Sequence, residues 1–210
     1  MKRKTAYENP IFCFVFKVVT NIWVGLKGWK FEGEPNGSRK LILIGAPHTS
    51  NWDFIYMVIG SFKKNLKLFW MVKDSVFKSP LGPLANWTGG IPIERSAHHN
   101  MVDQMINLFN ESEDLVLVNA PEGTRSKKDR WKTGFYYIAL GAKVPIQLCS
   151  VDYPKKTVIF GLVLEPTGDI EADFKIIDEY YLAFEGKHHE NYTRPLGELP
   201  KGEEQEKCKE

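Results

Sequence analysis

The chain has 210 residues, of which 43% are hydrophobic and 26% charged, and its formal net charge is +2 at pH 7. These values are ordinary for a globular protein with a substantial core, and the near-neutral charge argues against nucleic acid as the main partner. Three widely spaced cysteines provide neither a disulfide framework nor the spacing of a zinc site, which favours a reducing compartment. They are Cys13, Cys149 and Cys208.

Near the N-terminus, the apolar residues 11–26 follow a basic group at 2–4. Sixteen helical residues reach about 24 Å, short of the roughly 30 Å hydrocarbon core, so we expect no full membrane span. The polar side chains expected on one face are Lys17, Thr20 and Asn21. The apolar face expected opposite them consists of Phe12, Phe16, Val19 and Trp23. Two interpretations stay open: residues 1–30 form a membrane-interface helix, or this helix packs on the domain.

From residue 40 onward, strand and helix patterns alternate. The expected strands are 40–44, 66–72, 89–95, 115–118, 144–151 and 157–164, the last of them antiparallel. The expected helices are 53–62, 100–109, 133–140 and 170–184. Proline and glycine interrupt 73–84 too often for one regular element, and the charged tail 197–210 is expected to be disordered. This order predicts an α/β fold: one domain over 31–196 with a mainly parallel, partly mixed sheet flanked by helices, preceded by the N-terminal interfacial helix.

The first polar motif follows the buried strand 40–44, where Gly45 and Pro47 end the apolar run. His48 stands just after that strand, and Asp53 falls in the first turn of the next helix. A turn of this length can bring the carboxylate to the imidazole, fixing its tautomer and leaving the other ring nitrogen free to act as a base. The alternative is structural, because Ser50 and Asp53 alone form a capping box at a helix start.

Two further motifs follow later strands and are expected at the same edge of the sheet. The motif Glu122-Gly123-Thr124-Arg125 offers flexible backbone amides, a hydroxyl and a guanidinium within four residues, and these three groups suit a phosphate. Arg95 ends a short strand and adds a second guanidinium. Taken alone, each motif is more simply interpreted as a turn with a solvated arginine. The prediction rests on the agreement in position, since both arginines and the His48 motif are expected at the same edge of the sheet.

Four blocks in this order resemble the motifs of the glycerophospholipid acyltransferase family, which includes the 1-acyl-glycerol-3-phosphate acyltransferases. The blocks are His48-x4-Asp53, Gly-Ile-Pro-Ile-Glu-Arg at 90–95, Pro-Glu-Gly-Thr-Arg at 121–125 and Val-Pro-Ile at 144–146. The resemblance covers about residues 40 to 150 and includes the lysine- and proline-bearing stretch at 73–84. It identifies 31–196 as an acyltransferase domain.

The resemblance implies an O-acyltransferase of phospholipid biosynthesis that moves a fatty acyl group from acyl-CoA or acyl-carrier protein to a lysophospholipid hydroxyl. His48, oriented by Asp53, would take the hydroxyl proton as its oxygen attacks the thioester carbonyl. Arg95, Arg125 and Thr124 would hold the acceptor phosphate, and Glu122 would contact an acceptor hydroxyl or fix Arg125. Backbone amides near Gly123 or Ser50 are candidate oxyanion donors. No metal and no cofactor beyond the acyl donor are expected, and the enzyme would lie on the cytoplasmic face of the membrane, peripheral or interfacially embedded.

Several alternatives remain open. The acceptor could be another hydroxyl lipid, or the chain could be a lipid-phosphate binding protein without turnover. A hydrolase is a third possibility, although no Gly-x-Ser-x-Gly nucleophile motif occurs. Phe54, Phe69, Trp70 and Phe77 either line an acyl groove or belong to the core. The pairs at 98–99 and 188–189 are interpreted as surface histidines rather than metal ligands.

Overall fold

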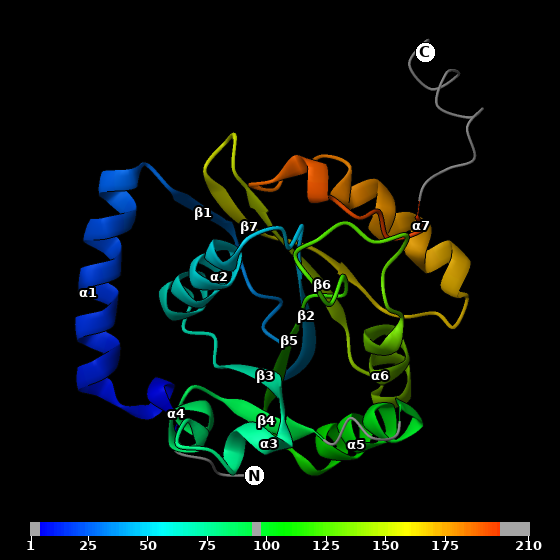
Figure 1. Cartoon of the computed structure of the whole chain (residues 1–210), viewed down its shortest axis with the longest axis horizontal. Coiled ribbons are helices and arrows are strands. Elements are labelled where there is room, and N and C mark those ends of the chain that lie inside the picture. Colours follow the sequence, from blue (N-terminus) through cyan, green and yellow to red (C-terminus); the bar gives the residue numbers. More distant parts are fainter. Residues whose placement is uncertain (1–4, 94–97, 198–210) are drawn as a thin grey trace.

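The fold is an α/β sandwich around one seven-stranded sheet (Figure 1), seen here in a computed structural model that describes residues 5–93 and 98–197, without the side chains of 98–100. The strand order is β1-β7-β6-β2-β5-β3-β4. The strands are β1 (Lys30–Gly33), β2 (Lys40–Ala46), β3 (Leu68–Lys73), β4 (Gly90–Ile93), β5 (Leu115–Asn119), β6 (Ile146–Asp152) and β7 (Thr157–Leu164). All pairs are parallel except β6 with β7, which confirms the predicted mixed sheet.

The centre of the sheet explains why residues 41–44 are all apolar. Strand β2 lies between β5 and β6, and both of its faces are covered, so all four side chains are 0% exposed. Ile42 and Ile44 pack into the core on one face, whereas Leu41 and Leu43 pack into the core on the other. A central parallel strand buried on both faces has no need of alternating polar residues.

The helices divide between these two cores. Helices α5 (His98–Glu111), α6 (Gly134–Ala142) and α7 (Ile170–Tyr181) supply Phe109, Phe135 and Phe174 to the first. Helices α1 (Pro10–Lys27) and α2 (Asn51–Lys63) supply Val24 and Tyr56 to the second. The remaining elements are short: η1 (Ala6–Glu8), α3 (Asp74–Phe77), α4 (Gly82–Trp87) and η2 (His189–Asn191).

The predicted elements from residue 40 onward are present, with ends that differ by a few residues. Strand β1 was not predicted; its four residues lie at the edge of the sheet, beside β7, and three of them are exposed. The segment 73–84 holds no single element, as expected, but forms the short helix α3 and the start of α4. The predicted C-terminal tail lies, apart from Gly197, outside the described residues.

Helix α1 corrects the predicted division of its faces. Phe12 and Phe16 pack against Phe62 of α2, and Trp23 stacks on Trp52, with ring centroids 5.9 Å apart. The polar residues lie on this same inward side: Thr20 is buried, Lys17 bonds to Asn65, and Asn21 accepts from Lys63. Of the predicted apolar face, only Val19 points outward. The prediction failed because the partners that select the buried face, such as Phe62, lie on another helix.

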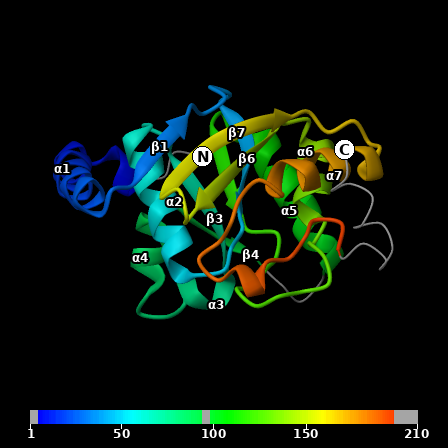
Figure 2. The ribbon, with the colours of Figure 1, turned by 90° about the horizontal axis from the view of Figure 1, so that it is seen from above.

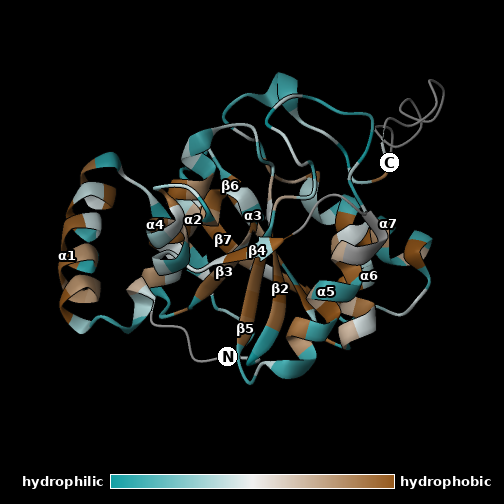
Figure 3. Cartoon of the chain, turned by 60° about the horizontal axis from the view of Figure 1, so that its bottom comes forward, coloured by the Kyte–Doolittle hydropathy of each residue, from teal (hydrophilic) through white to brown (hydrophobic). Residues whose placement is uncertain are grey.

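Helix α1 lies at the flank of the molecule (Figure 2), and its outer side is also apolar (Figure 3). Its exposed large side chains are Ile11, Phe14, Val15, Val18, Val19, Ile22 and Leu26. The 18-residue helix is long and apolar enough to cross a membrane by length and composition, and only 11% of it is buried. Both sequence interpretations therefore describe part of α1, which packs on the domain and still presents an apolar outer face.

Candidate active site

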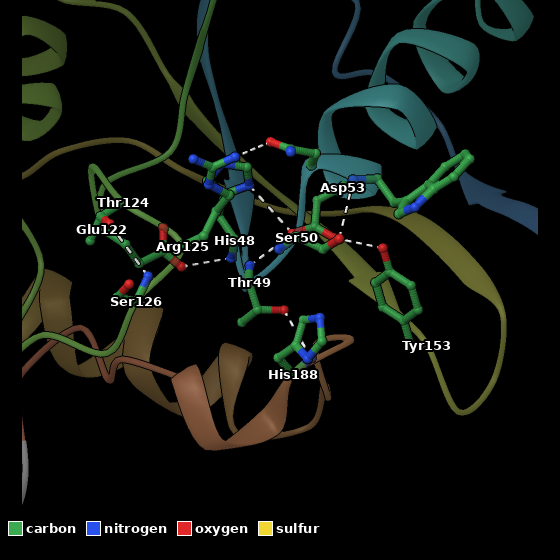
Figure 4. Close-up of polar contacts among 12 residues, drawn as sticks. His48, Thr49, Ser50, Asp53, Glu122, Thr124, Arg125, Ser126, Tyr153 and His188 are labelled. Carbon is green, nitrogen blue, oxygen red and sulfur yellow. Dashed lines mark hydrogen bonds and ion pairs between the residues drawn. The ribbon is translucent and has the colours of Figure 1, made fainter.

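The site forms where two parallel strands end at the same edge of the sheet. Register pairs Ile44 of β2 with Asn119 of β5, so the chain segments that follow them emerge side by side. The first segment carries His48 into α2, and the second carries Glu122 and Arg125 (Figure 4). Ligands bind at this edge in open α/β sheets, because loops from neighbouring strands converge there.

His48 and Asp53 make direct contact. The Nδ1 atom of His48 lies 3.3 Å from Oδ2 of Asp53, whose side chain is 5% exposed. The same Oδ2 accepts hydrogen bonds from the backbone N–H groups of Thr49 at 2.8 Å and Ser50 at 2.7 Å. Asp53 also completes a capping box with Ser50. The two interpretations of the motif are therefore compatible: the helix cap fixes the carboxylate, and the carboxylate orients the imidazole.

Tyr153 holds the second oxygen of this carboxylate. Its hydroxyl donates to Oδ1 of Asp53 at 2.6 Å, from the turn that joins β6 to β7 (Figure 4). Burial raises the pKa of the Tyr153 hydroxyl, and so does its hydrogen bond to the Asp53 carboxylate. Sequence reasoning missed this residue because the contact spans 100 positions, and nothing local distinguishes a tyrosine before a proline in a hairpin.

Glu122 supports the backbone of the same site. Its Oε1 accepts a hydrogen bond from the backbone N–H of His48 at 2.9 Å. Its Oε2 is buried and has no hydrogen-bond partner among the described residues. Burial raises the pKa of Glu122 to about 7, because a charged carboxylate without water or full hydrogen bonding is unfavourable there. Glu122 therefore joins the two polar loops through a hydrogen bond to the His48 backbone, whereas the hydrogen bond of Arg125 goes to Asn51.

Arg125 turns back toward the start of α2, where its Nη1 donates to Oδ1 of Asn51. Gly123 adopts a left-handed φ of +65°, which a side chain would strain, and Lys132 approaches it closely. Thr124 accepts from the backbone N–H of Ser126. The predicted Arg95 lies outside the described residues. The structure thus places Gly123, Thr124 and Arg125 beside His48, as expected from the strand order.

A cavity of about 1020 Å³ opens over the dyad. His48, Asp53, Thr124 and Arg125 line its polar part. Its apolar wall includes Phe54, Met57, Trp70, Met71, Ile93, Met101, Phe135 and Ile138. Of the aromatic residues considered for an acyl groove, Phe54 and Trp70 line this cavity, whereas Phe69 is buried in the core and Phe77 lies elsewhere.

Both predicted regions for oxyanion donors contain amides that are already occupied. The N–H of Ser50 donates to Asp53, and that of Gly123 donates to the carbonyl of Ala120 at 3.0 Å. These two amides are therefore not free donors in this structure.

Comparison with known proteins agrees with the fold. The Acyltransferase family model matches residues 29–152. The crystal structure of the 1-acyl-sn-glycerophosphate (LPA) acyltransferase PlsC from Thermotoga maritima is similar, with a TM-score of 0.55 and 17% identity, over 80% of this chain and 76% of that one. No curated protein matches the chain. Because the matched region covers more than half of the chain and contains the His48, Asp53 and Glu122–Arg125 motifs, this protein belongs to the Acyltransferase family.

Proposed function

We propose that the protein transfers a fatty acyl group from a thioester to the hydroxyl of a lysophospholipid such as 1-acyl-glycerol-3-phosphate. The observation that carries the proposal is the contact between His48 and Asp53 at a large cavity with apolar walls, which Arg125 also lines. An enzyme that joins an acyl chain to a phosphorylated lipid requires these three features together: a base, a cation and an apolar space.

In the proposed reaction His48 acts as the general base. The Nδ1 atom faces Asp53, so the Nε2 atom is available to take the proton from the acceptor hydroxyl. The hydroxyl oxygen then attacks the thioester carbonyl carbon, and the tetrahedral intermediate collapses with loss of the thiolate. The imidazolium of His48 returns its proton to the departing sulfur, so that the base is regenerated and no covalent enzyme intermediate is needed.

Other groups position the base and the acceptor. Asp53 orients His48, and Tyr153 and the Thr49 and Ser50 amides hold Asp53 in turn. Arg125, joined by Arg95 and Thr124, binds the acceptor phosphate, for which a guanidinium provides two parallel donors. Glu122 holds the backbone of His48 at its place in the loop.

A non-catalytic phosphate-binding protein is the weaker alternative, because binding a phosphate requires no base aimed by a buried carboxylate. A purified-protein assay separates the two: labelled decanoyl-CoA or decanoyl-acyl-carrier protein is supplied with 1-acyl-glycerol-3-phosphate in detergent. Appearance of labelled diacylated product supports the proposal. Release of labelled fatty acid instead would indicate a hydrolase, and no turnover would leave a binding protein.

The outer face of α1 supports a position at a membrane surface, where acceptor lipids are found. Seven large apolar side chains are exposed on it. A helix face of this kind is typical of a surface that contacts a membrane rather than water. Replacing Phe14 and Ile22 by Glu should reduce sedimentation with phospholipid vesicles while leaving turnover in detergent intact. The matched control replaces Ile176 and Leu182, which are exposed on or next to α7, by Glu. Equal loss of vesicle binding in both pairs would contradict a specific role for α1.

A further inference from the structure

A second hollow of about 440 Å³ lies beside the active-site cavity. Its lining residues are Glu122, Gly123, Thr124, Lys128, Asp129, Arg130 and Lys132. Gly123, Thr124 and Lys132 line both spaces, so the hollow adjoins the site in which the acyl transfer is proposed to occur.

The backbone around this hollow is fixed, although its cationic side chains are exposed. The N–H of Lys128 donates to Thr193 at 2.9 Å, and the indole of buried Trp131 donates to the Thr193 carbonyl at 2.7 Å. The N–H of Lys132 donates to the carbonyl of Pro121 at 3.0 Å. The loop is therefore anchored at three points, and its side chains project from a defined frame.

The charge of the hollow is not neutralised within the described part of the chain. The side chains of Lys128, Arg130 and Lys132 are exposed and have no hydrogen-bond or ion-pair partner there. Two carboxyl groups also line the hollow, Asp129, which is exposed, and Glu122, whose pKa burial raises to about 7, so the cations still outnumber the charged carboxylates. Three cations around one small concave space create a positive potential that attracts a compact polyanion.

The cations of the region divide between the two spaces, except for Lys132, which lines both. Arg125 lines the large cavity but not the hollow, whereas Lys128 and Arg130 line the hollow but not the large cavity. A reaction between a phosphorylated acceptor and a phosphorylated donor needs two such places. The acceptor phosphate is assigned to Arg125, which leaves the hollow for the second substrate.

We infer that the hollow binds the phosphate groups of a CoA thioester as acyl donor, with Lys128 and Arg130 as the residues that contact them. The inference rests on the proposed function and extends it to the choice of donor. A concave space of this size, lined by cations from a single loop, fits a small nucleotide better than the broad surface that an acidic carrier protein would need.

The test compares two donors with the same acyl chain. Octanoyl-CoA carries the phosphates, and octanoyl-pantetheine lacks them, while the acceptor, 1-acyl-glycerol-3-phosphate, is kept saturating. In the double variant Lys128→Ala/Arg130→Ala, the KM for octanoyl-CoA should rise about tenfold, because two charge-assisted contacts are lost, and the KM for octanoyl-pantetheine should not change. In the intact protein, the difference in KM between octanoyl-CoA and octanoyl-pantetheine should shrink with added salt, because salt screens exposed charges.

The matched control is Lys30→Ala/Lys175→Ala, which removes the same charge from two exposed positions on β1 and α7. It should leave the KM for both donors unchanged, which excludes an effect of net charge. An equal rise for both donors, or no rise for either, would overturn the inference. A raised KM for the acceptor alone would assign the hollow to the acceptor phosphate instead. With octanoyl-acyl-carrier protein as a third donor, a KM raised for this donor alone would assign the hollow to a carrier protein.

Failure of the proposed function is distinguishable from failure of this inference. If the intact protein transfers no acyl group from any donor, titration calorimetry with desulfo-CoA still tests the hollow directly. Binding that is weakened about tenfold in Lys128→Ala/Arg130→Ala, and not in the control pair, upholds the inference. Absence of binding to the intact protein overturns it.

Discussion

The His48–Asp53 pair and the loop 123–132 adjoin one another but differ in how firmly the protein holds their side chains. Asp53 is buried and contacts His48, two backbone amides and Tyr153. Arg125, by contrast, is exposed and bonds to Asn51, and the side chains of Lys128 and Arg130 are exposed as well. The base is thus oriented by buried groups, whereas these cations are held by few contacts and can adjust to a ligand. Substitutions should therefore affect kcat in the first region and KM in the second.

The largest effect is expected for His48→Ala. Loss of the general base should lower kcat by a factor on the order of 10²–10⁴, with an unchanged fold, because His48 lies on a loop rather than in the core. Steady-state kinetics measure kcat, and circular dichroism tests whether the fold is unchanged. The control His189→Ala removes an exposed histidine and should have no effect. Activity of His48→Ala within about threefold of the intact protein would eliminate the proposed base.

Glu122 sharpens the comparison, because it directly precedes the loop 123–132 and yet is as buried as Asp53. Its pKa is raised from 4.5 to about 7, so the folded state holds a proton that the unfolded state lacks between those pH values. The free energy of unfolding should therefore fall as pH rises through this window. Glu122→Gln removes this dependence and should be more stable than the intact protein at pH 8, by up to about 3 kcal/mol, with the gain disappearing toward pH 4.5.

Urea unfolding between pH 4.5 and pH 8 measures the Glu122 effect. The exposed Glu32 provides the control, and Glu32→Gln should follow the intact protein at every pH. A Glu122→Gln variant whose stability difference is constant across the range would show that the carboxylate does not titrate in the window.

Arg125→Ala tests the exposed, cationic region of the comparison. The acceptor KM should rise about tenfold with little change in kcat, because the guanidinium holds the phosphate in ground and transition states alike. Arg125→Lys should restore only part of the affinity if the contact is bidentate. Arg39→Ala is the matched control, since Arg39 is an exposed, ion-paired arginine that precedes β2 at the opposite edge of the sheet. A large fall in kcat with an unchanged acceptor KM would place Arg125 with the catalytic groups.

The smallest effect is expected for Tyr153→Phe, which removes one hydrogen bond from Asp53. A loss of about fivefold in kcat corresponds to roughly 1 kcal/mol of positioning. The KM for both substrates should stay unchanged, because Tyr153 contacts Asp53 and acts on the reaction only through the orientation of His48. Tyr56→Phe is the control: its ring packs in the same aromatic cluster, and its hydroxyl has no hydrogen-bond partner in the described chain. A rise in both KM values, or an equal loss of activity in Tyr56→Phe, would mean that Tyr153 is only structural.

The sequence predicts the fold well where the signal is local. The run of four apolar residues after Lys40 identifies the central strand, and the polar residues after each strand locate the site, because parallel strands end at one edge. What depends on tertiary neighbours could not be predicted. Tyr153 reaches Asp53 only through the β6–β7 turn, and the inward face of α1 is selected by Phe62 and Trp52.

The packing of α1 has a practical consequence for preparing the protein. Trp23 stacks on Trp52, which lies between His48 and Asp53, and Trp29 just beyond the helix meets Tyr153 edge-on at 5.2 Å. Removing the first 28 residues would delete Trp23 and leave Trp52 and Tyr56 without this stacking partner. Because Trp52 lies in the helix turn that carries Asp53, a shortened chain should lose activity even in detergent. Polar substitutions at outward positions such as Phe14 offer a better route to a well-behaved sample, because they leave the inner face of the helix in place.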